Sequence, residues 1–520
     1  ELMKYIEDMA QKLVVLHKNK WDGIWIRIAT NFMLIARLSD FDLIVGNPPW
    51  VKWEHLPAMY ANKIKEVCDI KHIFSGAGQY GGTQLNICAL ISNVTATNWL
   101  SKKGMLVFLM PDSIMSQDSY EGFRNFYLDY ETRERLYLQK IDRWKAPLRP
   151  FRCDNKPVTQ DFITYYFSRN LVDYHHGIPV TNITRNRKIS DDIINNTSNY
   201  KEAKKYLDFS ESIAIQLSNN NTSFSYKSNE YDFSKIIGPT SYLYRTGVEF
   251  TPQQLYMLKG HGKSSTSGNY RFKNKEFSLS KYKVKDEPKE GWDFPTKNIY
   301  PIITGPHIEE FKYDCNDEYC ILPYTKENTN EPISSEEMLK NNRQILVYLA
   351  EHKNLIDSQS EKSKKMHRGK EFYSLSKIGP YTFADYIVAA RDNSKFCASV
   401  IKKEMTPWNE EKQVICVKHT IIISQDKNNR FITEDEAYFI CGILNSEIVQ
   451  QYIQTTFKSN GFSLNKSNLY IPLYDSKNRK HKKIAGLAKL ASKAKNVNMD
   501  EIKKILMQVY LEICEEKDKN

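Results

Sequence analysis

The sequence lacks the features that mark membrane and secreted proteins. Its 520 residues contain no apolar run of roughly 18 residues or more and no amino-terminal signal peptide, so we expect no membrane role and a cytoplasmic location. Nine cysteines are present, but none forms a CxxC pair, and they are scattered along the chain. Their scatter argues against zinc and against a disulfide scaffold. We therefore expect reduced thiols and no metal site.

The charge of the chain is unbalanced in the positive direction. The formal net charge is +12, and 12% of the residues are aromatic. Both properties suit a protein that lies along a phosphate backbone and stacks on bases. Many basic proteins bind no nucleic acid, so charge alone decides little. The length allows about three domains.

The most informative segment is 41–50, an apolar run that ends in Asn-Pro-Pro-Trp. The run predicts a strand buried on both faces of a mainly parallel sheet, and such sheets bind ligands outside the carboxyl ends of their strands. Pro48 and Pro49 fix their φ angles and carry no N–H, so the turn is rigid and its carbonyls are free to accept hydrogen bonds. The alternative is a stiff turn without a further role, since Asn and Pro are ordinary turn residues.

This turn resembles the catalytic Asn-Pro-Pro-Tyr/Phe/Trp motif of S-adenosylmethionine-dependent adenine-N6 DNA methyltransferases. Its flanks, 25–27 and 51–57, resemble those of large type II restriction-modification enzymes with an Eco57I-like methylase region. The resemblance implies four catalytic residues, Asn47, Pro48, Pro49 and Trp50. By the same resemblance, the side-chain oxygen of Asn47 and the carbonyl of Pro48 accept hydrogen bonds from the adenine amino group, and Trp50 stacks on the base. The base must be flipped out, because its reacting atom is unreachable inside a duplex.

The resemblance also implies S-adenosylmethionine as the cofactor, held by a glycine-rich loop that precedes Asn-Pro-Pro in this family. No Gly-x-Gly occurs before Asn47, so we expect this loop on an upstream segment or a partner subunit. The stretch 74–78 matches Phe-x-Gly-x-Gly, but it follows a poor candidate strand and is better interpreted as a flexible loop. Asn86, at the start of a helix predicted over 85–100, is a candidate contact to cofactor or adenine. An ordinary helix-start role is an equal alternative.

Composition and resemblance together divide the chain into four parts. Residues 1–170 are expected to be an α/β, Rossmann-like methyltransferase domain that is incomplete at its N-terminus. Residues 171–235, rich in Asn, Ser and Lys, are expected to be a linker or insertion. Residues 236–475 resemble an α+β target-recognition domain, and residues 476–520 resemble the helices that close the chains of this family.

Basic residues of the recognition region are candidates for contacts to DNA phosphates. Lys263 ends a glycine-bearing basic stretch, 259–263, that is expected to be a loop; a second basic run supplies Lys364, Lys365 and Arg368. A solvated charged loop is the alternative for each. Phosphate contacts fix position and carry no sequence information, so these residues do not reveal the target sequence. His481 lies in another basic run and is expected to be solvated.

The function predicted from these features is that of a site-specific DNA methyltransferase. It would transfer a methyl group from S-adenosylmethionine to N6 of a flipped adenine in double-stranded DNA, in restriction-modification or phage defence. The alternative is a non-catalytic DNA-binding specificity subunit or an inactive remnant, and cofactor binding discriminates between the two. Glutamine methyltransferases of release factors share Asn-Pro-Pro-Tyr, but they lack a basic recognition domain of this length.

Overall fold

The structure is a computed structural model of the 520-residue chain, and it divides into two compact units, 1–227 and 228–520. Each unit is described by itself. The residues described are 2–20, 27, 30, 38–74, 85–144, 152–153, 156–157, 161–186, 199–218, 221–226, 231–277, 284–359, 369–391, 395–456, 464, 467–493 and 498–517. No helix in these ranges is long and apolar enough to cross a lipid bilayer.

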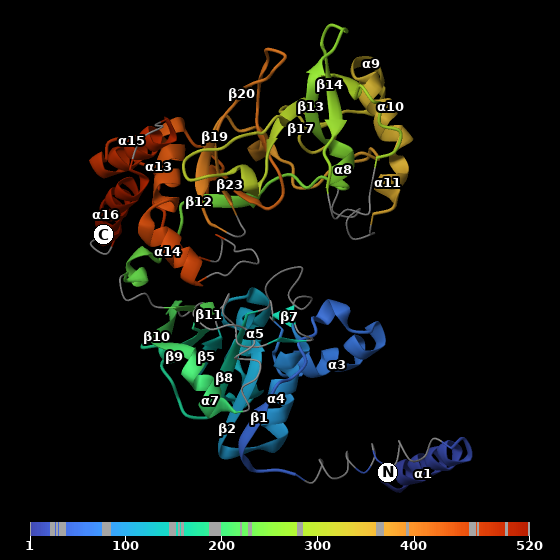
Figure 1. The fold of residues 1–520 in the computed structure, drawn as a ribbon, viewed down its shortest axis with the longest axis vertical. Coiled ribbons are helices and arrows are strands. Elements are labelled where there is room, and N and C mark those ends of the chain that lie inside the picture. Colours follow the sequence, from blue (N-terminus) through green and yellow to red (C-terminus); the bar gives the residue numbers. More distant parts are fainter. Residues whose placement is uncertain are drawn as a thin grey trace. The chain divides into compact units, whose positions relative to one another are not determined.

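The first unit is built on a seven-stranded sheet in the order β1-β2-β8-β5-β9-β10-β11 (Figure 1). Its strands are β1 (Phe41–Gly46), β2 (Leu100–Pro111), β5 (Tyr137–Trp144), β8 (Phe162–Ser168), β9 (Ile178–Arg185), β10 (Leu207–Ser218) and β11 (Asn221–Tyr226). β1 is parallel to β2, whereas β8 is antiparallel to both β2 and β5. The carboxyl ends of β1, β2 and β5 therefore lie at the same edge of the sheet as the amino end of β8.

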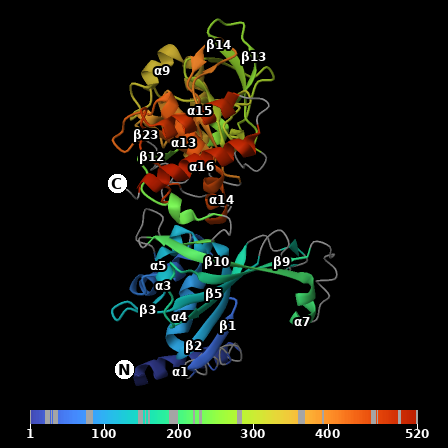
Figure 2. The same ribbon diagram turned by 90° about the vertical axis from the view of Figure 1, so that its left-hand side faces the viewer.

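The unit also contains helices and short strands (Figure 2). The helices are α1 (Leu2–Lys18), α3 (Ala58–Ile70), α4 (Ile87–Trp99), α5 (Glu121–Asn125) and α7 (Tyr200–Ala203). The short strands are β3 (Tyr127–Asp129), β4 (Glu134–Arg135), β6 (Arg152–Cys153) and β7 (Lys156–Pro157). α4 is apolar around most of its circumference and packs on β2, so its burial helps to form the core of the unit. This core also contains Leu106, Phe108, Ile141 and Tyr165.

Strand β1 differs from its predicted environment. Phe41, Leu43 and Val45 share one face of the strand and are 40%, 57% and 69% exposed. Ile44, on the other face, packs against the core. The prediction that β1 is buried on both faces is wrong, because nothing in the described part of the chain covers the face that carries Phe41, Leu43 and Val45. Parallel strands are usually covered on both faces, so this exposed apolar face is unusual.

The structure of residues 171–235, the stretch rich in Asn, Ser and Lys, also differs from the expectation of a linker or insertion. It contains β9, β10 and β11, and β10 pairs with β9 over 207–214. Ile178 and Val180 are buried, while intervening positions are exposed or half-buried. The polar side chains of the exposed positions dilute the apolar pattern that identifies a strand in a sequence. The boundary between the two units falls after Lys227.

The second unit contains two larger sheets. The four-stranded sheet has the order β12-β23-β18-β19, and the six-stranded sheet has the order β15-β14-β13-β17-β16-β22. The strands of the first are β12 (Tyr242–Thr246), β18 (Ile387–Arg391), β19 (Ala398–Ile401) and β23 (Thr420–Asp426). The strands of the second are β13 (Met257–Lys263), β14 (Asn269–Asn274), β15 (Trp292–Pro295), β16 (Ile299–Ile303), β17 (Glu318–Ile321) and β22 (Ile415–Cys416). A separate ribbon pairs β20 (Glu404–Met405) with β21 (Glu411–Lys412).

Helices lie beside these sheets and at the end of the chain. They are α8 (Gln253–Tyr256), α9 (Ser335–Asn341), α10 (Arg343–Glu351), α11 (Lys353–Asp357), α13 (Glu434–Leu444), α14 (Glu447–Thr456), α15 (Arg479–Lys493) and α16 (Met499–Lys517). α15 and α16 occupy the region where closing helices were predicted, and α15 packs on both α13 and α16. The second unit is therefore a mixed α and β structure with a helical end.

Candidate functional site

The Asn-Pro-Pro-Trp turn leaves β1 at the carboxyl edge of the first sheet, as the sequence predicts. Asn47 and Pro49 are exposed, Pro48 is buried and Trp50 is half-buried. Gly46, just before the turn, lies against Phe108 of β2, and a Cβ atom at Gly46 would stand 2.9 Å from that ring. A side chain at position 46 would therefore force the Phe108 ring to shift.

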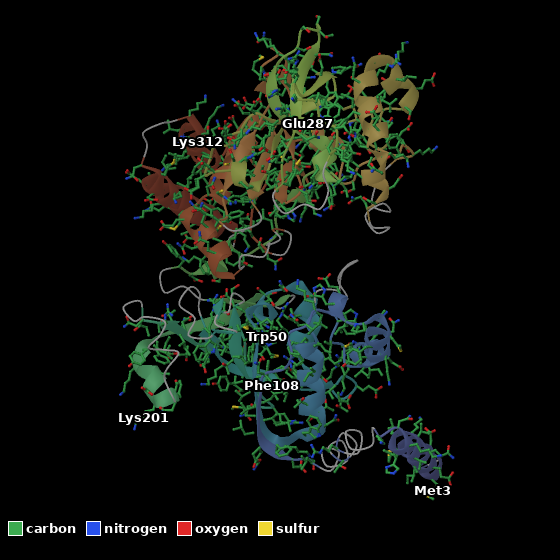
Figure 3. All side chains as sticks on the ribbon, turned by 45° about the vertical axis from the view of Figure 1, so that its right-hand side comes forward. Met3, Trp50, Phe108, Lys201, Glu287 and Lys312 are labelled. Carbon is green, nitrogen blue, oxygen red and sulfur yellow. The ribbon has the colours of Figure 1, made fainter. Side chains whose placement is uncertain are left out.

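The Trp50 ring contacts the neighbouring strands β2 and β8. Its Nε1 donates a hydrogen bond to the carbonyl of Leu109 at 3.2 Å, and its centroid lies 5.9 Å from that of Phe162. Trp50 thus lies beyond Phe108 in the direction of the carboxyl end of β2 (Figure 3). The turn presents a polar amide, two rigid prolines and an aromatic ring at one edge of the sheet.

The chain after Trp50 runs beside the start of α4. The Ile87 amide donates to the Val51 carbonyl at 2.9 Å, and the Trp53 amide donates to the Leu85 carbonyl at 2.7 Å. These bonds form an isolated bridge between Lys52 and Asn86. Two segments that are far apart in the sequence therefore meet directly behind the Asn-Pro-Pro-Trp turn.

Asn86 is buried at the N-cap position of α4, yet its side chain does not cap that helix. Its Nδ2 donates to the Tyr120 hydroxyl at 2.8 Å, while its Oδ1 is buried and has no hydrogen-bond partner among the described residues. Burial, as the largest cause, raises the pKa of Tyr120 to about 12, so its hydroxyl stays neutral at ordinary pH. A buried amide oxygen without a donor is rare and costs free energy. The geometry therefore does not fit an ordinary capping role for Asn86.

A buried polar cluster lies at the same edge of the sheet. Asp112 directly follows β2, and the Tyr226 hydroxyl donates to its Oδ1 at 3.2 Å. The Nε of Arg143, at the end of β5, lies 3.5 Å from the Asp112 Oδ2, and its guanidinium carbon lies 3.9 Å from the centroid of the Tyr226 ring. Burial, reinforced by the charge of Asp112, raises the pKa of Tyr226 well above its ordinary value. Tyr226 therefore remains a hydrogen-bond donor to Asp112.

Sequence reasoning missed this cluster. No sequence pattern marks Asp112 or Arg143, and Tyr226 lies in the stretch 171–235 that is expected to be a linker or insertion. The order of strands in the sheet brings the three residues close together, and no regular spacing along the chain relates them. Nothing in the local sequence around Arg143 or Tyr226 could have identified them.

The predicted basic residues have different outcomes. Lys263 is exposed at the end of β13, which pairs with β14, so the expectation of a loop over 259–263 is wrong. Alternation of apolar and polar residues is interrupted there by Gly260 and Gly262, which hides the strand from pattern reading. Three of the predicted basic residues lie outside the described residues: Lys364, Lys365 and Arg368. Most of the glycine-bearing stretch 74–78 also lies outside them.

The structure offers no candidate metal site among the described residues. Within those ranges, no group of three or more His, Cys, Asp or Glu side chains is placed to hold a metal ion. The free cysteines there are mostly buried, as in Cys68, Cys88 and Cys320.

Comparison with known proteins gives matches at the level of family and fold. Residues 4–139 match the model of the Eco57I restriction-modification methylase family. Two type II methyltransferases, M.HincII of Haemophilus influenzae and M.HindII of Haemophilus influenzae strain Rd, are each 25% identical over 121 residues, which is 21% of this chain and 20% of the relative. The match thus spans about a fifth of the length of these relatives.

A solved structure extends the likeness to both units. The type IIL restriction-modification enzyme MmeI, solved in complex with DNA, matches with a TM-score of 0.51 and 11% sequence identity. The match covers 91% of this chain and 53% of the MmeI chain. At this identity the match shows a shared fold, and this chain spans about half the length of MmeI.

Proposed function

We propose that this chain, whose residues 4–139 belong to the Eco57I restriction-modification methylase family, handles the base and recognises the DNA in a site-specific DNA methyltransferase. The reaction we propose is methyl transfer from S-adenosylmethionine to N6 of a flipped adenine in double-stranded DNA, in restriction-modification or phage defence. The observation that carries the proposal is the Asn47–Trp50 turn at the carboxyl edge of the sheet, with an exposed amide and a half-buried indole.

The turn supplies the groups that this chemistry needs. The exposed Asn47 side-chain oxygen and the Pro48 carbonyl accept hydrogen bonds from the adenine amino group, which keeps the lone pair of N6 available for attack. Pro48 and Pro49 have no N–H to occupy neighbouring carbonyls and hold the turn rigid. No covalent bond to the enzyme would be needed, because N6 would attack the methyl carbon as the bond from that carbon to the sulfonium sulfur breaks, the sulfur would keep the electron pair, and N6 would then lose a proton.

Trp50 supplies a stacking surface for the extruded base. Enzymes that modify a base inside a duplex must take it out of the helix, and stacking on an aromatic side chain offsets part of the cost of unstacking. The indole of Trp50 is held by its bond to the Leu109 carbonyl. Its face therefore needs little further ordering when the base arrives.

We propose that Asn86 makes one contact, either to the cofactor or to the adenine. Its buried Oδ1 has no donor among the described residues, and its backbone is joined to the segment that follows Trp50. When bound, S-adenosylmethionine supplies the activated methyl group. We propose that the other cofactor contacts come from an upstream segment or a partner subunit.

The exposed face of β1 supports that placement. Phe41, Leu43 and Val45 form an apolar stripe on a strand whose neighbour, β2, is parallel to it. Exposed apolar surface of this kind marks an interaction site. A segment that carries the cofactor loop would cover this stripe and stand next to the Asn47–Trp50 turn.

Double-stranded DNA is the proposed partner of the second unit. MmeI, which shares the fold, was solved in complex with DNA, and the chain has a formal net charge of +12. We assign Lys263, Lys364, Lys365 and Arg368 to phosphate contacts. Such contacts supply affinity that is independent of sequence and depends on salt.

Two measurements test the proposed function. Calorimetry measures S-adenosylmethionine binding by the 520-residue chain and by a version extended upstream of Glu1. Transfer of a tritiated methyl group to DNA, followed by digestion to nucleosides, then identifies the modified base. We expect cofactor binding and N6-methyladenine only with the extended chain. DNA binding without cofactor binding or methyl transfer in either protein would instead establish a non-catalytic specificity subunit or an inactive remnant.

A further inference from the structure

A backbone carbonyl of β2 holds the indole of Trp50. The parallel ladder of β1 and β2 ends at the pair Gly46–Phe108. Leu109 is the next residue of β2, and its carbonyl accepts the Trp50 Nε1–H at 3.2 Å. The Trp50 indole thus donates a hydrogen bond to the main chain of β2 just past the end of the ladder, where β1 turns away. A phenylalanine ring at this position has no donor and could not make this bond.

The Phe162 ring supports Trp50 from the neighbouring strand. The two ring centroids are 5.9 Å apart with an interplanar angle of 41°. On its other side, Phe162 stacks on Trp144 at 6.2 Å and 28°. Trp144 and Phe162 are directly paired in the ladder of β5 and β8, and the Trp144 Nε1 donates to the Thr164 hydroxyl at 3.1 Å. Phe162 therefore lies between two indoles that are each fixed to a strand.

We propose that Phe162 is a positioning residue for the stacking face of Trp50. This inference rests on the proposed function, in which Trp50 contacts the flipped adenine and Phe162 acts only through Trp50. The hydrogen bond to Leu109 fixes one edge of the indole, and the tilted Phe162 ring restricts rotation of the indole plane about that edge. When a base stacks on a ring that is already fixed, Trp50 loses little further conformational freedom. This is the advantage of preorganisation.

The first test observes the Trp50 indole directly in the full chain. The chain has eight tryptophans, and the 15N-indole resonance of Trp50 is identified by its loss in Trp50→Phe. We expect Phe162→Leu to accelerate deuterium exchange of the Trp50 Nε1–H at least tenfold. Unchanged exchange would overturn the proposal, because Phe162 would then not hold the ring.

The matched control separates positioning from loss of packing. Phe224 lies in the same unit and, like Phe162, is only 2% exposed, but its ring partner is Tyr174, at 4.9 Å. Phe224→Leu removes a comparable buried ring away from Trp50, and we expect the Trp50 exchange rate to stay within twofold of the original. Equal acceleration by Phe224→Leu and Phe162→Leu would also overturn the proposal, because general loosening of the unit would then explain both.

The second test asks whether the position of the ring matters for the reaction. With the cofactor-binding segment present, we expect Phe162→Leu to lower kcat for tritiated methyl transfer to DNA about tenfold, with DNA affinity within twofold of the original. Phe224→Leu should retain kcat. If the unaltered protein transfers no methyl group, the proposed function fails, whereas the exchange measurement still decides whether Phe162 holds Trp50. If Phe162→Leu changes exchange but not kcat, the positioning role is overturned.

Discussion

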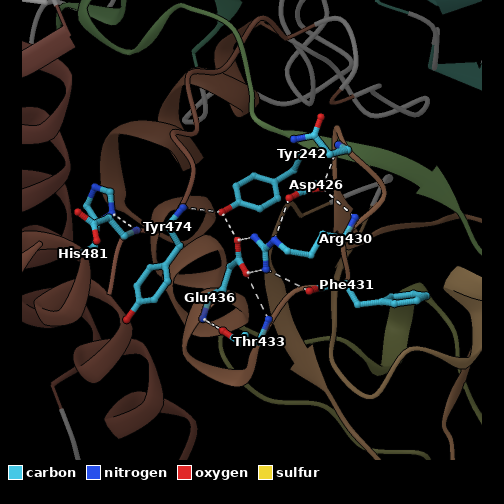
Figure 4. Close-up of polar contacts among 10 residues, drawn as sticks. Tyr242, Asp426, Arg430, Phe431, Thr433, Glu436, Tyr474 and His481 are labelled. Carbon is cyan, nitrogen blue, oxygen red and sulfur yellow. Dashed lines mark hydrogen bonds and ion pairs between the residues drawn. The ribbon is translucent and has the colours of Figure 1, made fainter. Parts of the chain in front are cut away.

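Arg430 donates a hydrogen bond from each terminal nitrogen of its guanidinium to the Glu436 carboxylate, at 2.9 and 2.8 Å (Figure 4). The carboxylate is buried and also accepts the Tyr242 hydroxyl at 2.8 Å. Arg430 further reaches the Asp426 carboxylate through its Nε at 3.0 Å, and Thr433 forms a capping box with Glu436 at the start of α13. This network joins β12, β23 and α13, so it connects the four-stranded sheet to the helical end of the chain.

Replacing Arg430 by methionine should destabilise the second unit. The change leaves the buried Glu436 charge without its cation, and breaking a buried ion pair in this way costs about 3–5 kcal/mol. Because the Arg430 side chain is 46% exposed, we expect a loss near the lower end, about 3 kcal/mol of the free energy of unfolding. Urea denaturation followed by circular dichroism measures it.

An exposed ion pair in the same unit provides the control. Lys353 and Asp357 lie 2.6 Å apart on α11, and both side chains are about half exposed. Lys353→Met should change the free energy of unfolding by no more than about 0.5 kcal/mol, since exposed pairs contribute little. Equal losses in the two variants would show that the burial of Glu436 does not determine the cost.

Segment 41–50 shows how far local sequence determines structure. The apolar run and the two prolines correctly predict strand β1 and the turn that presents Asn47 at its carboxyl end. The exposure of Leu43 and Val45 could not be predicted in the same way. Burial of a strand face depends on the elements that pack across it, and the residues of the strand do not encode those elements.

The buried cluster at the sheet edge shows the limit of pattern reading. Asp112 directly follows β2, whereas Arg143 and Tyr226 belong to β5 and β11. Dozens of residues separate these positions along the chain, and only the strand order brings them together. β9, β10 and β11 escaped prediction for a related reason, because polar residues occupy their exposed positions. Long-range pairing of this kind leaves no local periodicity in the sequence.

His481 is a different case, because the sequence contained a usable signal. It lies in a lysine-rich run, and it was expected to be solvated. In α15 it shares the buried face with Ile484, Ala485 and Ala488, at the spacing of three, four and seven residues that defines one side of a helix. Its ring stacks on Phe439 with centroids 4.5 Å apart. The expectation was therefore wrong, because the lysines point outward and the histidine does not.

The buried histidine should make the stability of the second unit depend on pH. Burial lowers the pKa of His481 below 6.5, only partly opposed by the charges of Asp475 and Glu516. As pH falls through 6.5, the unfolded chain takes up a proton first. The stabilising contribution of His481 is thus complete above that pH and is lost as pH falls toward the lower folded-state pKa.

His481→Phe keeps an aromatic ring against Phe439 and removes the titration. The free energy of unfolding of the variant should fall less between pH 7 and pH 5 than that of the unaltered protein, by at most about 1.4 kcal/mol per pH unit. The variant also loses the acceptor for the Asp475 amide, which lowers its stability at every pH at which His481 of the unaltered protein is neutral in the folded state. The slope is therefore the informative quantity, and parallel curves from urea denaturation across this pH range would contradict the prediction.

On the proposed function, Lys263 contributes to DNA binding through a phosphate. Lys263→Met should weaken binding to all DNA sequences alike and lower the slope of log K against log salt by about one, because one fewer counterion is released. Replacing Lys364 and Lys365 together should lower it by about two. Fluorescence anisotropy over a range of salt concentrations gives the slope. Lys353→Met serves as the control, and a slope unchanged in Lys263→Met would remove this residue from the interface.

Asn47→Ala separates the chemistry from DNA binding most sharply. On the proposed function, Asn47 contacts only the amino group of the flipped adenine, so its loss should lower kcat for methyl transfer at least 100-fold, on the order of the loss when one preorganised polar group is removed from an active site. Affinity for DNA comes largely from phosphates and should change less than about twofold.

The matched control for this prediction is Asn170→Ala. Asn170 is also exposed in the first unit, but it follows β8, which runs antiparallel to β2, and so it lies at the opposite edge of the sheet. Asn170→Ala should retain both methyl transfer and binding. Unchanged methyl transfer in Asn47→Ala would contradict the mechanism, because the amide would then not act on the adenine amino group. A large loss of DNA affinity in Asn47→Ala would instead assign the turn to holding the duplex rather than to the chemistry.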